Sequence, residues 1–219
     1  MITTEEFAQE RRCLDKLKKG KEEYLVLEGS DSKFLLSAPH AIGQVRLGMK
    51  KGAEPSTASL ALVLQKLTNC HAIIKVANEN NDANFDEKSV YKTKMEQVVR
   101  EKDIKFILDL HGLASTRKVL INSGVYHGQL LQTEEKLKHF NKFEDILLGN
   151  GFNPIADNPF SGGPLTIAYH FGKDEGIFSI QVEVNSRIFM RSNENRLNRL
   201  INALKQFIKY AENLSSKTS

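Results

Sequence analysis

Two patterns of hydrophobic residues alternate along this chain: short apolar runs, and longer segments in which apolar residues recur every three or four positions. Short, nearly continuous apolar runs are typical of strands that a sheet buries on both faces. They predict strands at residues 24–27, 34–38, 72–76, 105–112, 119–121 and 177–184. Longer segments with apolar residues three or four apart predict amphipathic helices. These helices are expected at residues 4–19, 55–68, 87–102, 133–148 and 193–214.

The order of these elements decides the fold class. Strands and helices alternate, with no internal repeat and no linker-like composition, over 219 residues. This alternation predicts a single α/β domain spanning residues 1–219, a three-layer fold of the phosphorylase/hydrolase-like kind with a mostly parallel mixed sheet. The glycine- and lysine-rich run at residues 41–52 and the Gly-Pro-rich run at residues 158–164 are expected to be loops.

The strand at residues 105–112 carries an unusual pair at its end. Side chains alternate along a strand, so Asp109 and His111 point to the same side. Burying a carboxylate with an imidazole is costly unless a partner compensates them. A metal ion held by His111, with Asp109 orienting a neighbouring ligand, would account for both residues. A salt-linked pair without a metal accounts for them equally well.

Two further strand ends deliver groups of the same kind. The strand at residues 34–38 leads into His40, and the strand at residues 177–184 carries Glu183 between apolar neighbours. Glu54 stands before Pro55 at the start of a predicted helix. Two imidazoles and one carboxylate are a common ligand set for catalytic zinc. We therefore predict His40, Glu54 and His111 as zinc ligands and Glu183 as the base that takes a proton from water.

Composition and charge indicate which kinds of molecule this protein binds. The chain has 31 basic and 27 acidic residues, a net charge of +4, and its lysines are scattered. A nucleic-acid surface would need basic residues clustered with aromatic ones, so a small-molecule substrate is expected rather than a nucleic acid. There is no apolar run of membrane-spanning length. Two cysteines without a metal-site spacing favour a soluble, cytoplasmic protein.

Several short motifs occur in a characteristic order. They are Ser37-Ala38-Pro39-His40 with an acidic residue a loop later, Asp109-Leu110-His111-Gly112, Gly162-Gly163 followed by Thr166, and Gln181-Val182-Glu183-Val184-Asn185. Together they resemble the N-formylglutamate amidohydrolase family, over residues 40–187. The resemblance implies a fold related to zinc carboxypeptidases and aspartoacylases, and hydrolysis of an amide on a small acyl amino acid. It makes His40 and His111 zinc ligands and Glu183 the catalytic carboxylate.

The chain departs from the family pattern at one place. Where members carry an Asn-Arg pair for a substrate carboxylate, residues 80–85 contain no arginine. Arg46 and Arg187 are the best-placed cations by sequence, either for the oxyanion of the transition state or for a substrate carboxylate. A surface salt bridge accounts for Arg46 equally well. Thr166 and His170 are further candidates for substrate binding, although a packed histidine also accounts for His170.

Three functions remain open on this reading. The first is a zinc-dependent amidohydrolase acting on an N-formylglutamate-like or peptide-like amide. The second is a non-catalytic small-ligand-binding protein on the same fold, and the third is a peptidase or deacylase acting on a larger substrate. Fold does not separate them. Glu183 does, because a pure binding protein has no need of an acid there.

Overall fold

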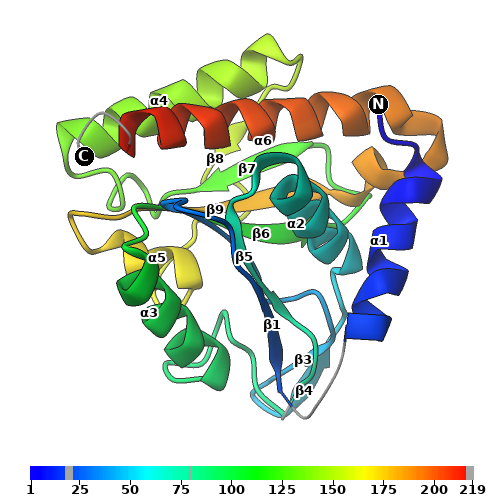
Figure 1. Ribbon diagram of the computed structural model, residues 1–219, viewed down its shortest axis with the longest axis horizontal. Helices are drawn as coiled ribbons and strands as arrows, with labels where there is room; N and C mark the ends of the chain where they lie inside the picture. The colour runs from blue at the N-terminus through cyan, green and yellow to red at the C-terminus, as the bar shows by residue number, and fades with distance from the viewer. Residues whose placement is uncertain (18–21, 79, 216–219) are drawn as a thin grey trace.

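The computed structural model describes residues 1–17, 22–78 and 80–215 (Figure 1). The elements are α1 (Thr4–Leu17), β1 (Tyr24–Leu27), β2 (Phe34–Ala38), β3 (Gln44–Arg46), β4 (Met49–Lys51), α2 (Pro55–Thr68), β5 (His71–Lys75), α3 (Val90–Lys102), β6 (Phe106–Leu113), β7 (Ile121–Gly124), α4 (Glu134–Gly149), β8 (Ile155–Ala156), α5 (Ile167–Gly172), β9 (Phe178–Asn185), the 3-10 turns η1 (Ser186–Phe189) and η2 (Arg191–Asn193), and α6 (Glu194–Ser215).

Seven strands form one mixed sheet in the order β1-β5-β2-β6-β9-β7-β8. The central pairs β5–β2, β2–β6 and β6–β9 are parallel, and so is β7–β8. The pairs β1–β5 and β7–β9 are antiparallel. The predicted α/β class with a mostly parallel mixed sheet is confirmed. β6 and β9, the two longest strands, are buried along almost their whole length and lie inside the sheet.

Helices pack on both faces of the sheet and make three layers (Figure 1). One core contains apolar side chains of α1, α2, α4 and α6 together with one set of strand residues. The other contains side chains of α3 and α5 together with the alternate set, including Leu35, Ile73 and Ile107. Because strand side chains alternate, β2, β5 and β6 each contribute to both cores.

Local sequence signals explain where the boundaries differ from expectation. Helix α3 begins three residues later than predicted, because the Ser89 side chain caps it by accepting a hydrogen bond from Lys92 N. The strand predicted at residues 119–121 is β7, which begins at Ile121. The predicted loop at residues 41–52 contains the β3–β4 hairpin. The predicted end of the first helix at residues 18–20 lies outside the described residues.

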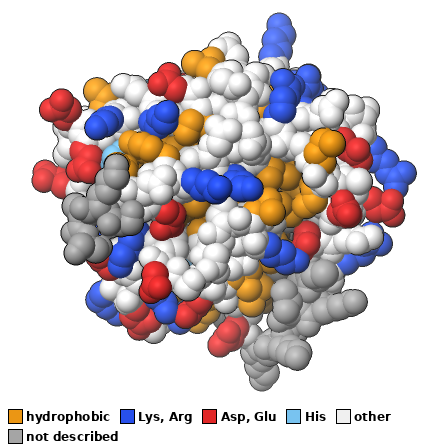
Figure 2. Space-filling model, turned by 45° about the horizontal axis from the view of Figure 1, so that its top comes forward, with side chains coloured by type: hydrophobic (Ala, Val, Ile, Leu, Met, Phe, Trp, Pro, Cys, Tyr) orange, Lys and Arg blue, Asp and Glu red, His pale blue; other side chains and the backbone are white. Residues whose placement is uncertain are grey.

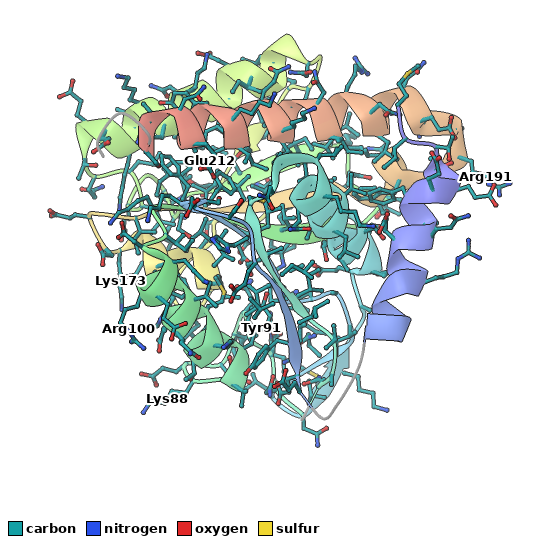
Figure 3. All side chains as sticks on the ribbon, viewed as in Figure 1. Lys88, Tyr91, Arg100, Lys173, Arg191 and Glu212 are labelled. Atoms are coloured by element: carbon teal, nitrogen blue, oxygen red, sulfur yellow. The ribbon has the colours of Figure 1, made fainter. Side chains whose placement is uncertain are left out.

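The surface mixes charges of both signs. On the face in Figure 2, Lys and Arg side chains are interspersed with Asp and Glu. In Figure 3, Lys88, Arg100 and Lys173 project outward from the region of α3 and α5. Among the described helices none is long and apolar enough to cross a bilayer.

Candidate metal centre and pocket

Three neighbouring parallel strands bring polar side chains to one edge of the sheet. In the β6–β9 pairing, His111 lies opposite Glu183 and Asp109 lies opposite Gln181. On the other side of β6, Ser37 of β2 lies opposite Asp109. In open α/β sheets, ligands bind outside the carboxyl ends of the strands. The candidate site lies at the carboxyl ends of β2, β6 and β9, which we call this edge of the sheet.

The structure brings together the three residues predicted as metal ligands. One ligand atom from each of His40, Glu54 and His111 lies within 4.8 Å of the others. Nδ1 of His40 is 3.1 Å from Glu54 Oε1, and Nδ1 of His111 is 3.3 Å from Glu54 Oε2. The two imidazole rings are 4.7 Å apart and nearly perpendicular. The Nδ1 atoms therefore face one shared space beside the Glu54 carboxylate.

Both imidazoles are oriented from behind by a fully buried carboxylate. His40 Nε2 lies 2.7 Å from Asp82 Oδ1, and His111 Nε2 lies 2.9 Å from Asp109 Oδ2. A proton on Nε2, shared with the carboxylate, leaves the Nδ1 lone pair for a metal ion. Carboxylates in this position fix the tautomer of metal-binding histidines and increase their basicity. The donor set therefore fits a divalent metal ion.

Sequence reasoning assigned no role to Asp82. It follows β5 by several residues, in the polar segment that lacks the arginine of the family pattern. Burial would raise the pKa of its carboxyl, but the hydrogen bond to His40 and the charges of His40 and Arg46 outweigh burial and lower it. An acid placed shortly after a buried strand is the signal that could have found this residue.

Asp109 is held by a second, neutral network. Ser37 Oγ donates to Asp109 Oδ1 at 2.8 Å and lies 3.1 Å from the Tyr91 hydroxyl. That hydroxyl donates to Ile73 O and accepts from Ala38 N. Burial raises the pKa of Tyr91, so its phenol stays neutral. Tyr91 lies on the side of α3 that faces the sheet (Figure 3), and it fixes the end of β2 beside the site.

Glu54 reaches the site because position 112 has no side chain. The Gly112 amide donates to Glu54 Oε2 at 2.9 Å. A Cβ on residue 112 would lie 3.0 Å from Glu54 Cβ and 3.1 Å from its Cγ. Glycine therefore allows β6 and the start of α2 to approach this closely.

The charges around Glu54 couple it to both imidazoles. Burial would raise its pKa, but hydrogen bonds with His111 and His40 outweigh burial and lower it. Burial would lower the pKa of His111, and the charges and hydrogen bonds of Asp109 and Glu54 raise it well above its ordinary value. Metal binding at His111 must therefore displace a proton, as metal–histidine binding generally does.

Glu183 is a separate buried acid at the same edge. Its side chain is 5% exposed, and Gln181 Nε2 donates to its Oε1 at 2.8 Å. Burial raises the pKa of Glu183 to about 7, and the negative charge of Glu54 adds to this, against the opposing charge of His111. Its carboxyl can therefore both hold and release a proton near neutral pH, as a general acid–base requires.

This raised pKa predicts how the stability of the metal-free protein depends on pH. The folded state holds the Glu183 proton more tightly than the unfolded chain, so stability is lost as pH rises from about 4.5 to about 7. We expect Glu183→Gln to raise the free energy of unfolding at pH 8 by on the order of 3 kcal/mol, and to change it little at pH 4.5. Melting temperatures measured with a chelator present would show this.

Glu87→Gln, which removes an exposed acid, is the control for that measurement and should be neutral at both pH values. Equal stabilisation by Glu183→Gln at pH 4.5 and pH 8 would show that the effect comes from packing and that the pKa is not raised.

A pocket of about 240 Å³ opens over these residues. One wall is the segment 160–164, and another is formed by β3, β4 and Phe85. Gly162 adopts φ +66°, and a Cβ there would lie 2.9 Å from Gly124 O, so only glycine lets this segment pack against β7. The pocket is lined by His40, Arg46, Lys51, Glu54, Asn84, Phe85, His111, Gly112, residues 160–164, Thr166, Gln181 and Glu183.

Two of the other predicted site residues line this pocket. Arg46 does so while Nε and Nη2 of its guanidinium each lie 2.8 Å from Asp82 Oδ2. Thr166 caps α5: its hydroxyl donates to Gly163 O and accepts from Tyr169 N. Both side chains therefore already have intramolecular partners.

The remaining two lie elsewhere. Arg187 donates to the backbone oxygens of Arg117 and Lys118 and to Asn185 Oδ1, which ties η1 to the segment after β6. His170 Nε2 lies 2.8 Å from Glu96 Oε1, in a different hollow between α3 and α5. Residues 167–172 form a helix, which turns His170 away from the pocket. The described atoms of neither residue line the pocket at the metal centre.

No protein-family model matches the sequence, and no curated protein does either. Solved structures share its fold. N-formylglutamate amidohydrolase from Ralstonia eutropha JMP134 aligns with a TM-score of 0.58 at 10% identity, over 90% of this chain and 99% of that one. A metallo-carboxypeptidase from Burkholderia cenocepacia aligns with a TM-score of 0.57 at 12% identity, over 94% and 69%. A bacteriophage poly-gamma-glutamate hydrolase aligns with a TM-score of 0.50 at 17% identity, over 95% and 97%.

These similarities establish the architecture. The fold is the one that the sequence motifs implied, and the neighbours include the family that those motifs resemble. At 10–17% identity they leave the chemistry to the site itself.

Proposed function

We propose that this chain is a zinc-dependent amidohydrolase that cleaves the amide bond of a small N-acyl amino acid or a peptide-like substrate. One observation carries the proposal: two imidazole Nδ1 atoms and one carboxylate converge within 4.8 Å, beside a separate buried acid. Three nitrogen and oxygen ligands with room for water are typical of catalytic zinc. The solved structures with this fold include an N-formylglutamate amidohydrolase and metallo-carboxypeptidases, which supports the same reaction class.

The residues divide into three tasks. A divalent ion at His40, Glu54 and His111 would act as a Lewis acid and lower the pKa of water from about 15.7 towards about 7. Glu183 accepts the proton of the attacking water and then delivers it to the leaving nitrogen. Asp82 and Asp109 keep the imidazoles oriented throughout. The predicted role of Arg46 at the oxyanion stays a prediction, because that side chain is already paired with Asp82.

The pocket sets the size of the substrate. About 240 Å³ accommodates an acyl amino acid or the end of a peptide, and the segment 160–164 limits access from one side. The sequence expectation of a small-molecule substrate and a cytoplasmic location is kept as part of this proposal.

A metal analysis combined with a substrate screen tests the proposal. The protein would be loaded with zinc, dialysed and assayed for bound metal, then for amine release from N-formyl, N-acetyl and dipeptide substrates. We expect one ion per chain and turnover that a chelator abolishes and zinc restores. A protein that binds one ion and a ligand but releases no amine would instead be a binding protein on this fold.

A further inference from the structure

Among the described residues that line the pocket, the β3–β4 hairpin supplies the arginine and the lysine. It forms a two-stranded sheet of its own, separate from the main sheet, and lies on the side of the molecule away from α4 and α6 (Figure 1). Arg46 and Lys51 are its contributions to the pocket lining. The role of the hairpin therefore depends on what each cation does.

The strand pairing decides which residues of the hairpin face the pocket. Gln44 lies opposite Lys51, and Arg46 lies opposite Met49. Residues that are paired directly, or that are two apart on a strand, share a face, so Arg46 and Lys51 are diagonal neighbours on one face. Lys50 belongs to the opposite face and is exposed. Two consecutive lysines of the same strand therefore have different surroundings.

Arg46 is the anchor of the hairpin. Its guanidinium makes two 2.8 Å contacts to Asp82 and lies 4.6 Å above the centre of the Phe85 ring. The neighbouring Val45 amide donates to Asn81 O at 3.2 Å. The fully buried Asp82 carboxylate thus neutralises the positive charge of Arg46, and little of that charge is left for a ligand.

Lys51 has no such partner among the residues that the structure describes. Within the described part of the chain, no carboxylate lies within 4.0 Å of its ammonium and no acceptor forms a hydrogen bond with it. Its side chain is half-buried at the pocket wall, three residues before Glu54 in the sequence. A lysine confined beside a pocket without a counter-ion attracts an anionic group of a ligand more strongly than a freely solvated one.

We propose that Lys51 determines specificity by binding a carboxylate of the substrate. The substrate class is then an amide that carries a free carboxylate close to the bond that is cleaved, and the corresponding carboxyl-amidated compounds are poor substrates. The inference rests on the proposed amidohydrolase function and adds to it the residue that selects the substrate. Asn84 and Gln181 line the same pocket, and Asn84 Nδ2 donates to Gln181 Oε1 at 3.4 Å. These two uncharged side chains would lie beside the bound ligand.

The test compares Lys51→Met with Lys50→Met, which removes the same charge from the other face of the strand. Each variant is assayed with N-formylglutamate and with a fully carboxyl-amidated analogue. For Lys51→Met we expect KM for the acid to rise roughly 10- to 100-fold, the span of a hydrogen bond to a charged group, with a much smaller change in kcat. KM for the amidated analogue should change less than about twofold. Lys50→Met should behave as the wild type.

A binding measurement separates this inference from the proposed function. Titration calorimetry of N-formylglutamate into zinc-loaded Glu183→Gln, with and without Lys51→Met, should give the same roughly 10- to 100-fold loss of affinity. Higher ionic strength should weaken binding to the protein with Lys51 and affect the other variant less. If no compound is hydrolysed but this difference in binding is present, the hydrolase proposal fails and the role of Lys51 stands. If Lys51→Met and Lys50→Met shift binding equally, the role of Lys51 is refuted.

Discussion

Replacing Glu183 with glutamine is expected to lower kcat roughly 100- to 10,000-fold, the usual contribution of a general acid–base. Glutamine keeps the shape of the side chain and the hydrogen bond from Gln181 Nε2. It cannot accept the proton of the attacking water. Because Glu183 lies outside the group formed by His40, Glu54 and His111, the variant should still bind one metal ion per chain. Steady-state kinetics and metal analysis on the same sample measure both quantities.

Glu144→Gln is the matched control for this variant. Glu144 is another partly buried acid with a raised pKa, but it hydrogen-bonds Ser123 Oγ, away from the pocket lining. It should retain wild-type kcat. Turnover that survives in Glu183→Gln would rule out Glu183 as the base, whereas loss of metal together with turnover would show that its role is structural.

Replacing His111 with glutamine is expected to abolish stoichiometric metal binding. The variant removes the Nδ1 atom that faces Glu54 and keeps a side chain that can still donate to buried Asp109. Loss of a direct ligand should cost more affinity than the roughly 10- to 100-fold that follows loss of a partner behind the ligand. Competition with a chromogenic chelator gives the dissociation constants, and circular dichroism checks that the fold is kept.

Two further variants calibrate this result. Asp109→Asn should fall in the roughly 10- to 100-fold range, because it weakens the support of His111 without removing a ligand. His127→Gln, in an exposed loop where the His127 side chain is 70% exposed, should bind metal as the wild type does. A His111→Gln protein that holds its metal as tightly as the wild type would place the ion elsewhere.

The order of elements was predictable because it depends on local periodicity. Apolar runs that both faces of a sheet must bury identified β2, β6 and β9, and the parallel arrangement brings the ends of such strands to one edge. This is why the sequence alone predicts that His40, His111 and Glu183 lie close together. Glu54 is predictable as a ligand for a related reason: it stands before Pro55, which marks the start of α2, and the start of α2 lies beside the carboxyl ends of these strands.

Contacts between distant loops were not predictable in this way. Asp82 comes from a polar segment without periodicity, and its role depends on the path of that segment behind His40. The β3–β4 hairpin lies in a run rich in glycine and lysine that has no apolar alternation. The sequence therefore could not show that Arg46 is paired with Asp82 or that Lys51 lines the pocket.

Two predicted substrate-binding residues, Arg187 and His170, do not line the pocket, because local turns that the sequence pattern does not reveal direct their side chains elsewhere. Arg187 lies two residues after β9, so proximity in sequence suggests a role in the pocket, but the turn η1 directs its guanidinium to the backbone after β6. His170 is a candidate for substrate binding by sequence, but α5 turns it towards Glu96 instead. In both cases a short helical turn of only a few residues decides the direction of the side chain.

The sequence by itself determined the class of the fold, the strands that lie inside the sheet and the four acid and imidazole side chains at its edge. These follow from periodicity and from strand alternation, which act over a few residues and are written into the chain directly. Only the tertiary structure decided which carboxylate supports which imidazole, which pocket cation has no partner among the described residues and how large the pocket is. Those features depend on segments tens of residues apart meeting within hydrogen-bonding distance, and packing of the whole molecule, rather than any local pattern, sets that geometry.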